Sequence, residues 1–160
     1  MSSLMQSAVL LVFSLDDFQY ALRLPAVQRV IRIVEITPLP AGPGVVLGMI
    51  DLRGRIVPVV DIRQRFHLPW REARLSDSLI IAQTSKRTVA LPVDAVIGLV
   101  ERSDSFTTSA EEIVPGIEYV EGVVRLEGGL VLIHNLDAFL SMDEEKALEM
   151  ALELATEGSP

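Results

Sequence analysis

The chain of 160 residues contains no cysteine. Disulfide bonds and thiolate chemistry are therefore excluded, and the composition fits a reducing cytoplasm. Aromatic residues make up only 5% of the chain, too few for the stacking surfaces with which small barrels bind single-stranded nucleic acid. No apolar run approaches the ~18 residues needed to cross a bilayer, so we expect no membrane insertion. The N-terminal apolar run is short and has no basic segment before it, so we interpret it as a strand and not as a signal peptide.

Negative charge is in excess and unevenly distributed. The formal net charge of −8 disfavours nucleic acid and anionic lipid as partners. Residues 1–74 hold nine Arg and six acidic residues, a balance of +3, whereas residues 75–160 hold five basic and sixteen acidic residues, a balance of −11. Either the acids are solubilising surface, or the two halves meet different partners or each other head to tail. In the second case we expect a monomer alone and weak heterologous assembly with a partner.

The chain repeats itself in a strand-like pattern. Residues 48–66 (GMIDLRGRIVPVVDIRQRF) align without a gap with residues 122–140 (GVVRLEGGLVLIHNLDAFL), at an offset of 74. A preceding pair, Tyr20-Ala21-Leu22 and Val89-Ala90-Leu91, aligns at an offset of 69. The order of elements is therefore A-B-A′-B′. Two similar small units predict a pseudo-symmetric body with a groove between them, a shape that suits a protein that joins partners.

Short apolar runs separated by turn signals predict an all-β fold. We expect five strands in each unit, the number of an SH3-like or OB-like barrel: 9–15, 18–24, 31–36, 45–52 and 56–62, then 79–83, 88–93, 97–102, 120–126 and 130–133. Residues 25–30 are expected to be a short connection, and residues 37–44, 63–74 and 103–117 to be loops or connectors.

The C-terminal segment predicts one helix. Ser141 and Glu144 form a capping-box pattern, and acidic residues follow in the first turn, where the helix dipole favours them. Apolar residues then recur on one face, at Leu148, Ala151, Leu152 and Ala155. We expect a helix over residues 143–155 that packs on the barrels.

Catalytic and metal-binding patterns are not found in the sequence. The two histidines, His67 and His134, have no ligand spacing, and no nucleophile, base and orienting group can be assigned. We therefore expect no enzyme activity, metal or cofactor. His134 takes an apolar strand position and is expected to be partly buried with its hydrogen bonds satisfied, whereas Trp70 either caps the first barrel or lies exposed. The alternative to a binding module is a small-ligand sensor that uses the cleft between the barrels.

Residues 48–66 strongly resemble the signature of the CheW family of chemotaxis coupling proteins. The runs FSLDDFQYAL, VALPVDAV and LVLIHNLDAFL resemble other parts of that family, so the likeness covers Val9 to Leu154. It implies one domain over residues 8–156 made of two intertwined five-stranded SH3-like barrels, at about 8–74 and 75–140. It also implies a cytoplasmic, non-enzymatic adaptor that couples the helical tips of chemoreceptors to the regulatory domain of a CheA-type histidine kinase.

The resemblance also implies a set of receptor- or kinase-binding residues. The motif arginine, Arg53, is expected near the receptor groove, and five apolar residues are expected to line it: Val27, Val30, Leu79, Ala90 and Leu99. At two further positions the chain departs from the family, with Arg29 where Glu is frequent and Asp51 where Asn is frequent. The usual Glu–Arg pair with Arg53 is therefore missing, and we expect Asp51 to pair with Arg29, Arg53 or both.

Overall fold

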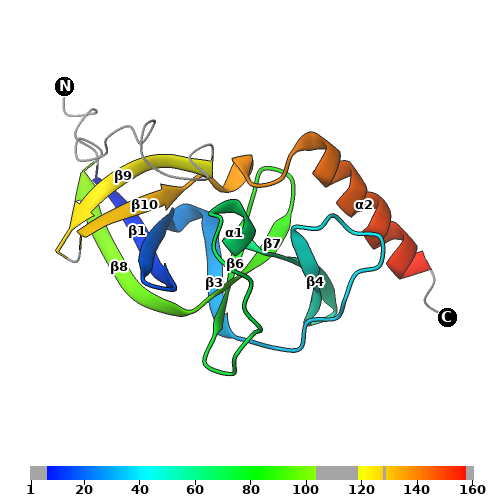
Figure 1. The fold of residues 1–160 in the computed structure, drawn as a ribbon. Coiled ribbons are helices and arrows are strands. Elements are labelled where there is room, and N and C mark those ends of the chain that lie inside the picture. The colour runs from blue at the N-terminus through cyan, green and yellow to red at the C-terminus, as the bar shows by residue number, and fades with distance from the viewer. Residues whose placement is uncertain (1–6, 104–118, 128, 158–160) are drawn as a thin grey trace.

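Two five-stranded sheets form the body of the molecule, and one long helix lies against its outside (Figure 1). The computed structural model describes residues 7–103, 119–127 and 129–157. Its strands are β1 (Ser7–Leu15), β2 (Phe18–Arg23), β3 (Val27–Arg32), β4 (Val46–Leu52), β5 (Arg55–Val60), β6 (Ser78–Gln83), β7 (Thr88–Val93), β8 (Ala95–Ser103), β9 (Val120–Leu126) and β10 (Gly129–His134). The helices are η2 (Leu24–Ala26), α1 (Ile62–Arg65), η5 (Leu136–Ala138) and α2 (Met142–Glu157).

Each sheet takes strands from both halves of the chain. The strand order is β8-β1-β2-β10-β9 in one sheet, called sheet A, and β3-β6-β7-β5-β4 in the other, called sheet B. The hairpin β1–β2 therefore pairs with the second half's β8, β9 and β10. The hairpin β6–β7 pairs with the first half's β3, β4 and β5. The chain crosses between sheets after β2 and again after β7, so the two sheets are interlocked.

The pairing between hairpins follows the sequence repeat. In sheet A, β10 runs parallel to β2 with Ile133 opposite Ala21. In sheet B, β5 runs parallel to β7 with Val59 opposite Ala90. Val59 and Ile133 are related by the offset of 74, and Ala21 and Ala90 by the offset of 69. The repeat thus marks positions that make the same contacts in the two sheets.

The small core of each sheet repeats in the same way. The sheet A core consists of Leu10, Val12, Ala21, Val124, Val131 and Ile133. The sheet B core consists of Leu79, Ile81, Ala90, Ile50, Val57 and Val59. In this order every pair of residues is related by one of the two offsets. The shared apolar pattern of the two halves is therefore the pattern of two equivalent barrel interiors.

A third and larger core lies between the sheets. It takes Phe13 and Tyr20 from sheet A, Ile80 and Leu91 from sheet B, and Phe66 from the segment after α1. The ring of Tyr20 stacks on Phe66, with centroids 4.5 Å apart. Because β1 and β6 send alternate side chains into a barrel interior and into this central core, both faces of these strands are buried. Each fully buried large apolar side chain contributes about 1.5–3 kcal/mol, so the central core holds the sheets together strongly.

Sheet B closes through a contact that needs glycine. Thr37, which follows β3, exchanges two backbone hydrogen bonds of 2.8 Å with Met49 of β4. A Cβ atom on the neighbouring Gly48 would lie 2.3 Å from the carbonyl oxygen of Thr37, far closer than van der Waals contact permits. This explains the glycine at the start of the first copy of the repeated motif.

The predicted all-β fold with two five-stranded units and a C-terminal helix is confirmed. The division into barrels at residues 8–74 and 75–140 is wrong, because each sheet is built from both halves. The strand predicted at 31–36 is β3, which begins at Val27 directly after η2 and ends at Arg32. Ile62 belongs to α1 and not to a strand. The loop predicted at 103–117 lies almost entirely outside the described residues.

The predicted helix and its capping box are confirmed. The N–H of Glu144 donates to Oγ of Ser141 at 3.1 Å, and the N–H of Ser141 donates to Oε1 of Glu144 at 2.9 Å. Leu148 and Ala151 are fully buried. The helix therefore packs by its predicted apolar face, on the side of the molecule where sheet B lies (Figure 1).

His134 differs from the expectation of a satisfied, partly buried side chain. It is 2% exposed and packs edge-on against Phe66 and Phe139, with ring centroids 5.3 and 4.9 Å away. Neither ring nitrogen bonds any described residue. Burial lowers the pKa of His134 to about 3, so the imidazole is neutral in the folded protein at neutral pH.

We predict that His134 destabilises the fold in acid. Its folded pKa of about 3 lies below the unfolded value of about 6.5. The unfolded chain therefore takes up the proton first, and stability is lost as pH falls from about 6.5 to about 3, by roughly 1 kcal/mol per pH unit. In His134→Leu this part of the pH dependence should disappear. Urea unfolding at several pH values measures it, with His67→Leu, a change at the exposed histidine, as control. Parallel pH profiles for wild type and His134→Leu would refute the assignment.

Candidate partner-binding surfaces

Strands β3 and β8 expose apolar side chains at equivalent positions. Each is a terminal strand in the order of its sheet. Val30 on β3 is 40% exposed and Leu99 on β8 is 59% exposed, and the offset of 69 relates them. On β8 the neighbouring outward residue, Ile97, is also 55% exposed. Val27 is half-buried against the central core. Three of the five predicted groove residues, Val27, Val30 and Leu99, are thus at least partly accessible.

Two of the residues predicted to line the groove are fully buried and cannot contact a partner. Leu79 and Ala90 are 0% exposed and belong to the sheet B core. The expectation that they face a groove is therefore wrong. They are the counterparts of Leu10 and Ala21 in sheet A, which are buried in the same way. Their role is to fill a barrel interior.

The hairpin between β4 and β5 presents Arg53 at its tip. Arg53 and Gly54 both have positive φ, 55° and 84°, as in the type I′ turn that matches the twist of a two-residue hairpin. Arg53 is exposed, and a long side chain in this conformation projects from the turn into solvent.

Asp51 supports this turn and does not pair with arginine. Its Oδ1 accepts the N–H of Gly54 at 2.7 Å. Among the described residues no ion pair joins Asp51 to Arg29 or Arg53, so the predicted pairing is wrong. A local backbone donor three residues away is a closer partner for a short acidic side chain than a mobile arginine. Asn offers the same acceptor oxygen.

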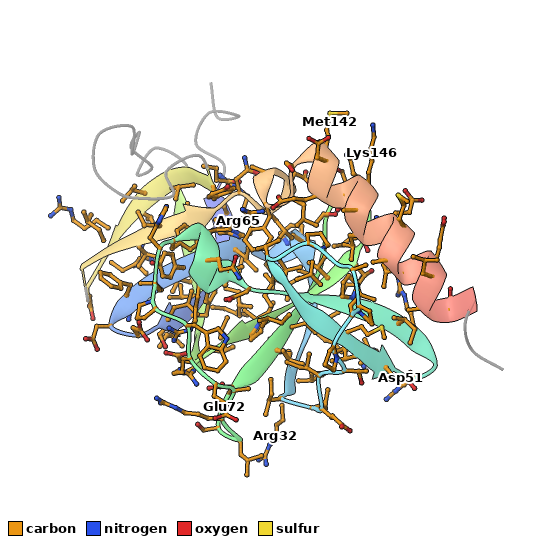
Figure 2. The ribbon with its side chains drawn as sticks, turned by 45° about the vertical axis from the view of Figure 1, so that its right-hand side comes forward. Arg32, Asp51, Arg65, Glu72, Met142 and Lys146 are labelled. Carbon is orange, nitrogen blue, oxygen red and sulfur yellow. The ribbon has the colours of Figure 1, made fainter. Side chains whose placement is uncertain are left out.

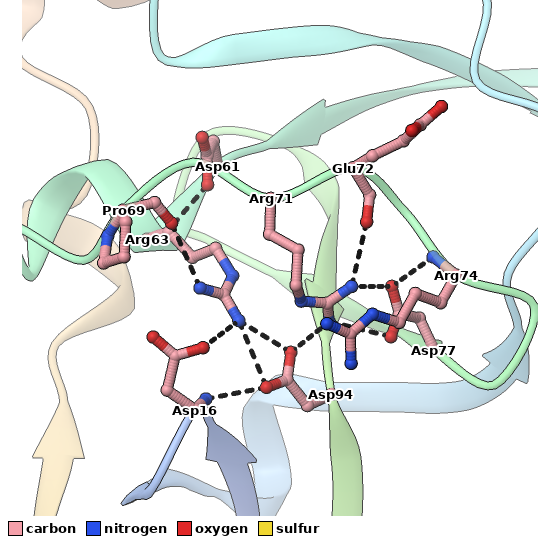
Figure 3. Close-up of polar contacts among 9 residues, drawn as sticks. All are labelled: Asp16, Asp61, Arg63, Pro69, Arg71, Glu72, Arg74, Asp77 and Asp94. Carbon is pink, nitrogen blue, oxygen red and sulfur yellow. Dashed lines mark hydrogen bonds and ion pairs between the residues drawn. The ribbon is translucent and has the colours of Figure 1, made fainter.

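A charged network joins the two sheets to the connector between α1 and β6 (Figure 3). The Nη2 of Arg63 donates to Asp16 at 2.8 Å and to Asp94 at 2.9 Å, and its Nη1 donates to the carbonyl oxygen of Pro69 at 3.2 Å. Asp16 lies in the β1–β2 turn of sheet A, and Asp94 lies where the chain leaves sheet B for β8. Arg63 therefore spans the point at which the chain changes sheets.

Arg71 extends the network along the connector. It pairs with Asp94, and it forms a two-pronged contact with the buried Asp77 at 2.9 and 3.1 Å. The other bonds of Asp77 fix the backbone, since its Oδ2 also accepts the N–H of Arg74 at 2.8 Å. The connector is thus fixed in position by buried charges.

The electrostatics of the network favour the charged forms of Arg63, Arg71 and Asp94. Burial opposes the charge on Arg63, but the hydrogen bonds and charges of Asp16 and Asp94 outweigh burial and raise its pKa. For Asp94, burial would raise the pKa, but bonds from Arg71, from the backbone N–H of Asp16 and from Arg63 outweigh it and lower the pKa. For Arg71, the bonds to Asp77 are the largest influence and raise the pKa.

Further ion pairs connect the arginine-rich first half to the acidic second half. Arg65 of α1 pairs with Glu144 of α2, donates to the carbonyl oxygen of Phe139 at 2.9 Å, and lies over the ring of Tyr119 at 5.1 Å. In Figure 2 it points toward the C-terminal segment. Arg23 pairs with Glu121 across β2 and β9. Some of the positive charge of the first half is therefore neutralised by acidic residues of the second half within the same molecule.

The described part of the chain holds no group of three His, Cys, Asp or Glu side chains placed to bind a metal ion. None of the helices in that part is long and apolar enough to cross a membrane.

A family model described as "CheW-like domain" matches residues 9–146. The chain belongs to the CheW-like domain family. It is 31% identical over 140 residues to the chemotaxis protein CheW of Rhizobium meliloti, covering 86% of this chain and 90% of the relative. It is 28% identical over 130 residues to the CheW of Thermotoga maritima, covering 81% and 85%. The solved structure of the scaffolding protein TtCheW from Thermoanaerobacter tengcongensis is similar with a TM-score of 0.79 and 26% identity, over 87% of this chain and 91% of that one.

We predict that Arg63 stabilises this CheW-like fold. In Arg63→Met the side chain keeps its apolar length, but Asp16 and Asp94 lose their shared cation. Breaking a largely buried charge pair from one side costs about 3 kcal/mol, which urea unfolding measures. Arg32→Met on β3 is the matched control, because Arg32 is exposed and forms no ion pair with a described residue. Equal stability of the two variants would show that the network contributes little.

Proposed function

We propose that this CheW-like protein is a chemotaxis adaptor that couples chemoreceptors to a CheA-type histidine kinase and has no catalytic activity of its own. The family match over residues 9–146 carries this proposal, and the solved relative, TtCheW, is a scaffolding protein, which supports it. On the same family grounds we place the protein in the cytoplasm. A small-ligand sensor, the alternative expected from the sequence, has no comparable support.

We assign the receptor tip to the exposed apolar residues of β3 and β8. Its apolar contacts are Val27, Val30 and Leu99, to which the exposed Ile97 is added. A chemoreceptor tip is helical, and an amphipathic helix binds by placing its apolar side chains against such residues. Arg29 and Arg53 are exposed and form no ion pair with a described residue, so they are available to acidic groups on the partner. Asp51 acts indirectly, by holding the turn that presents Arg53.

The kinase contact is assigned to the outer faces of the barrels. A regulatory domain built on the same duplicated plan has equivalent strands, so one barrel of this chain can meet the opposite barrel of the kinase in a head-to-tail contact. Such a heterologous contact propagates and does not close as a two-fold dimer. This arrangement suits a scaffold that links many receptors and kinases.

We predict that Val30→Glu and Leu99→Glu each weaken binding of the receptor tip at least about tenfold, because a charge replaces an apolar contact in each case. Binding of a receptor cytoplasmic fragment, measured by calorimetry, is the test. Leu130→Glu on β10 is the matched control, since Leu130 is 55% exposed but lies on neither β3 nor β8. Unchanged affinity in both test variants would remove this surface from the proposal.

We expect Arg53→Ala to weaken receptor or kinase binding by about 1–3 kcal/mol, as for an exposed arginine anchor. Because Arg53 has positive φ, a change there can also affect the hairpin. Arg53→Asn removes the charge while keeping a residue that tolerates this conformation. The same loss of binding in both variants, with unchanged thermal melting of Arg53→Asn, would support a contact role. Full affinity in Arg53→Asn would show that the charge does not contribute.

Assembly should be weak and sensitive to salt. Four first-half arginines are paired internally, whereas five exposed ones form no ion pair with a described residue: Arg29, Arg32, Arg53, Arg55 and Arg74. Exposed charges are screened beyond about 8 Å at physiological ionic strength. We expect a monomer alone, and a complex with the kinase that dissociates as salt rises, measured by sedimentation across a salt series. A tight homodimer that resists salt would contradict this assignment.

A further inference from the structure

A cleft of about 530 Å³ lies beside the connector, and none of the residues assigned above to the receptor lines it. The connector that follows α1 forms one wall with Trp70. The other walls come from the segment between β3 and β4 with Ile36 and Pro38, from β4 with Leu47, and from the end of β7 with Pro92. The volume is within the range of sites that bind a small ligand or two or three residues of a peptide.

The charged residues of the cleft are mostly acidic. Four carboxylates and two guanidinium groups line it, a net charge of −2: Asp61, Glu72, Asp77 and Asp94 against Arg63 and Arg71. Asp61 and Asp77 are only 5% and 4% exposed, so solvent screens them poorly. Both arginines are engaged by aspartates, and Asp61 accepts the backbone N–H of Arg63 at 3.0 Å. Glu72 is therefore the lining carboxylate that no described residue engages.

Trp70 is the only tryptophan of the chain and is 71% exposed. The segment that carries it is held in place, since Arg63 binds the carbonyl oxygen of the preceding Pro69 and Arg71 binds the carbonyl oxygen of Glu72 at 2.9 Å. The connector therefore presents Trp70 without a large ordering cost on binding. Tryptophan is also the aromatic residue that attracts a cation most strongly to its ring face.

We propose that this cleft binds a short segment of a partner polypeptide in which an arginine or lysine follows an apolar residue. The apolar side chain packs against Pro38, Leu47 and Pro92, and the cation lies between the ring of Trp70 and the carboxylate of Glu72. In Figure 3 the side chain of Glu72 points away from the charged network, so it is free to meet a ligand. The proposal does not depend on the receptor surface on β3 and β8.

The single tryptophan gives a direct measurement. We would titrate the full-length protein with acetyl-Phe-Arg-amide and follow the one indole N–H signal by NMR. The signal should shift and saturate. Acetyl-Phe-citrulline-amide, which has the same shape without the charge, should bind roughly fivefold to tenfold more weakly. Acetyl-Phe-Glu-amide should not bind. Equal affinity for the arginine and citrulline peptides, tighter binding of the glutamate peptide, or no saturable shift would each overturn the proposal.

A pair of variants with the same change in net charge tests the site itself. Glu72→Gln should weaken the arginine peptide severalfold. Glu127→Gln removes an exposed carboxylate that does not line the cleft and should leave the affinity unchanged. Neither carboxylate forms a hydrogen bond or ion pair with another residue in the described part of the structure, so both variants should fold as wild type does. Equal affinities of the two variants would show that overall charge, and not the cleft, attracts the peptide.

Discussion

The exchange of hairpins between the two sheets is the constraint on which the rest of the structure depends. Neither half of the chain holds a complete sheet, because β1 and β2 need β8 and β10, and β6 and β7 need β3 and β5. The central core fills the space between the sheets, and Arg63 and Arg65 tie the two halves at the points where the chain changes sheet or direction. The surfaces proposed for partners are displayed on this interlocked frame, so their relative positions are fixed without a partner.

The interlocked sheets also explain which positions of the repeat are buried and which are exposed. Within the repeat, the positions that match between halves are mostly interior ones, such as Leu10 with Leu79 and Ala21 with Ala90. Two matched apolar pairs are nevertheless exposed: Val30 with Leu99 on β3 and β8, and Ile56 with Leu130 on β5 and β10. The first pair is assigned to the receptor tip, whereas the second lies on strands that the receptor proposal does not use. The charged connector is, by contrast, specific to one half: the offset of 74 places Asp137 where Arg63 stands.

The sequence was sufficient for the strands, the terminal helix with its capping box, and the repeat. The family resemblance implied intertwined barrels, but the residue pattern did not reveal which strands are exchanged. The pairing of β10 with β2 joins residues more than a hundred positions apart and leaves no local pattern. It also misplaced Leu79 and Ala90, because β6 and β7 are buried on both faces and a strand of that kind shows no alternation from which a face can be assigned. Asp51 was given a long-range partner when a backbone donor lay three residues away. The connector network needed three-dimensional contacts between Asp16, Arg63 and Asp94, which spacing cannot show.

The exchange of hairpins is tested most directly by measuring whether the two halves, residues 1–74 and 75–160, fold as separate fragments. If the sheets are interlocked as described, each fragment alone should lack cooperative thermal unfolding and the near-ultraviolet circular dichroism of packed aromatic residues. An equimolar mixture should regain both, with a single transition. A fragment 1–74 that folds by itself into a stable barrel and melts cooperatively would contradict the exchange of hairpins, and with it the account of how this protein presents its surfaces.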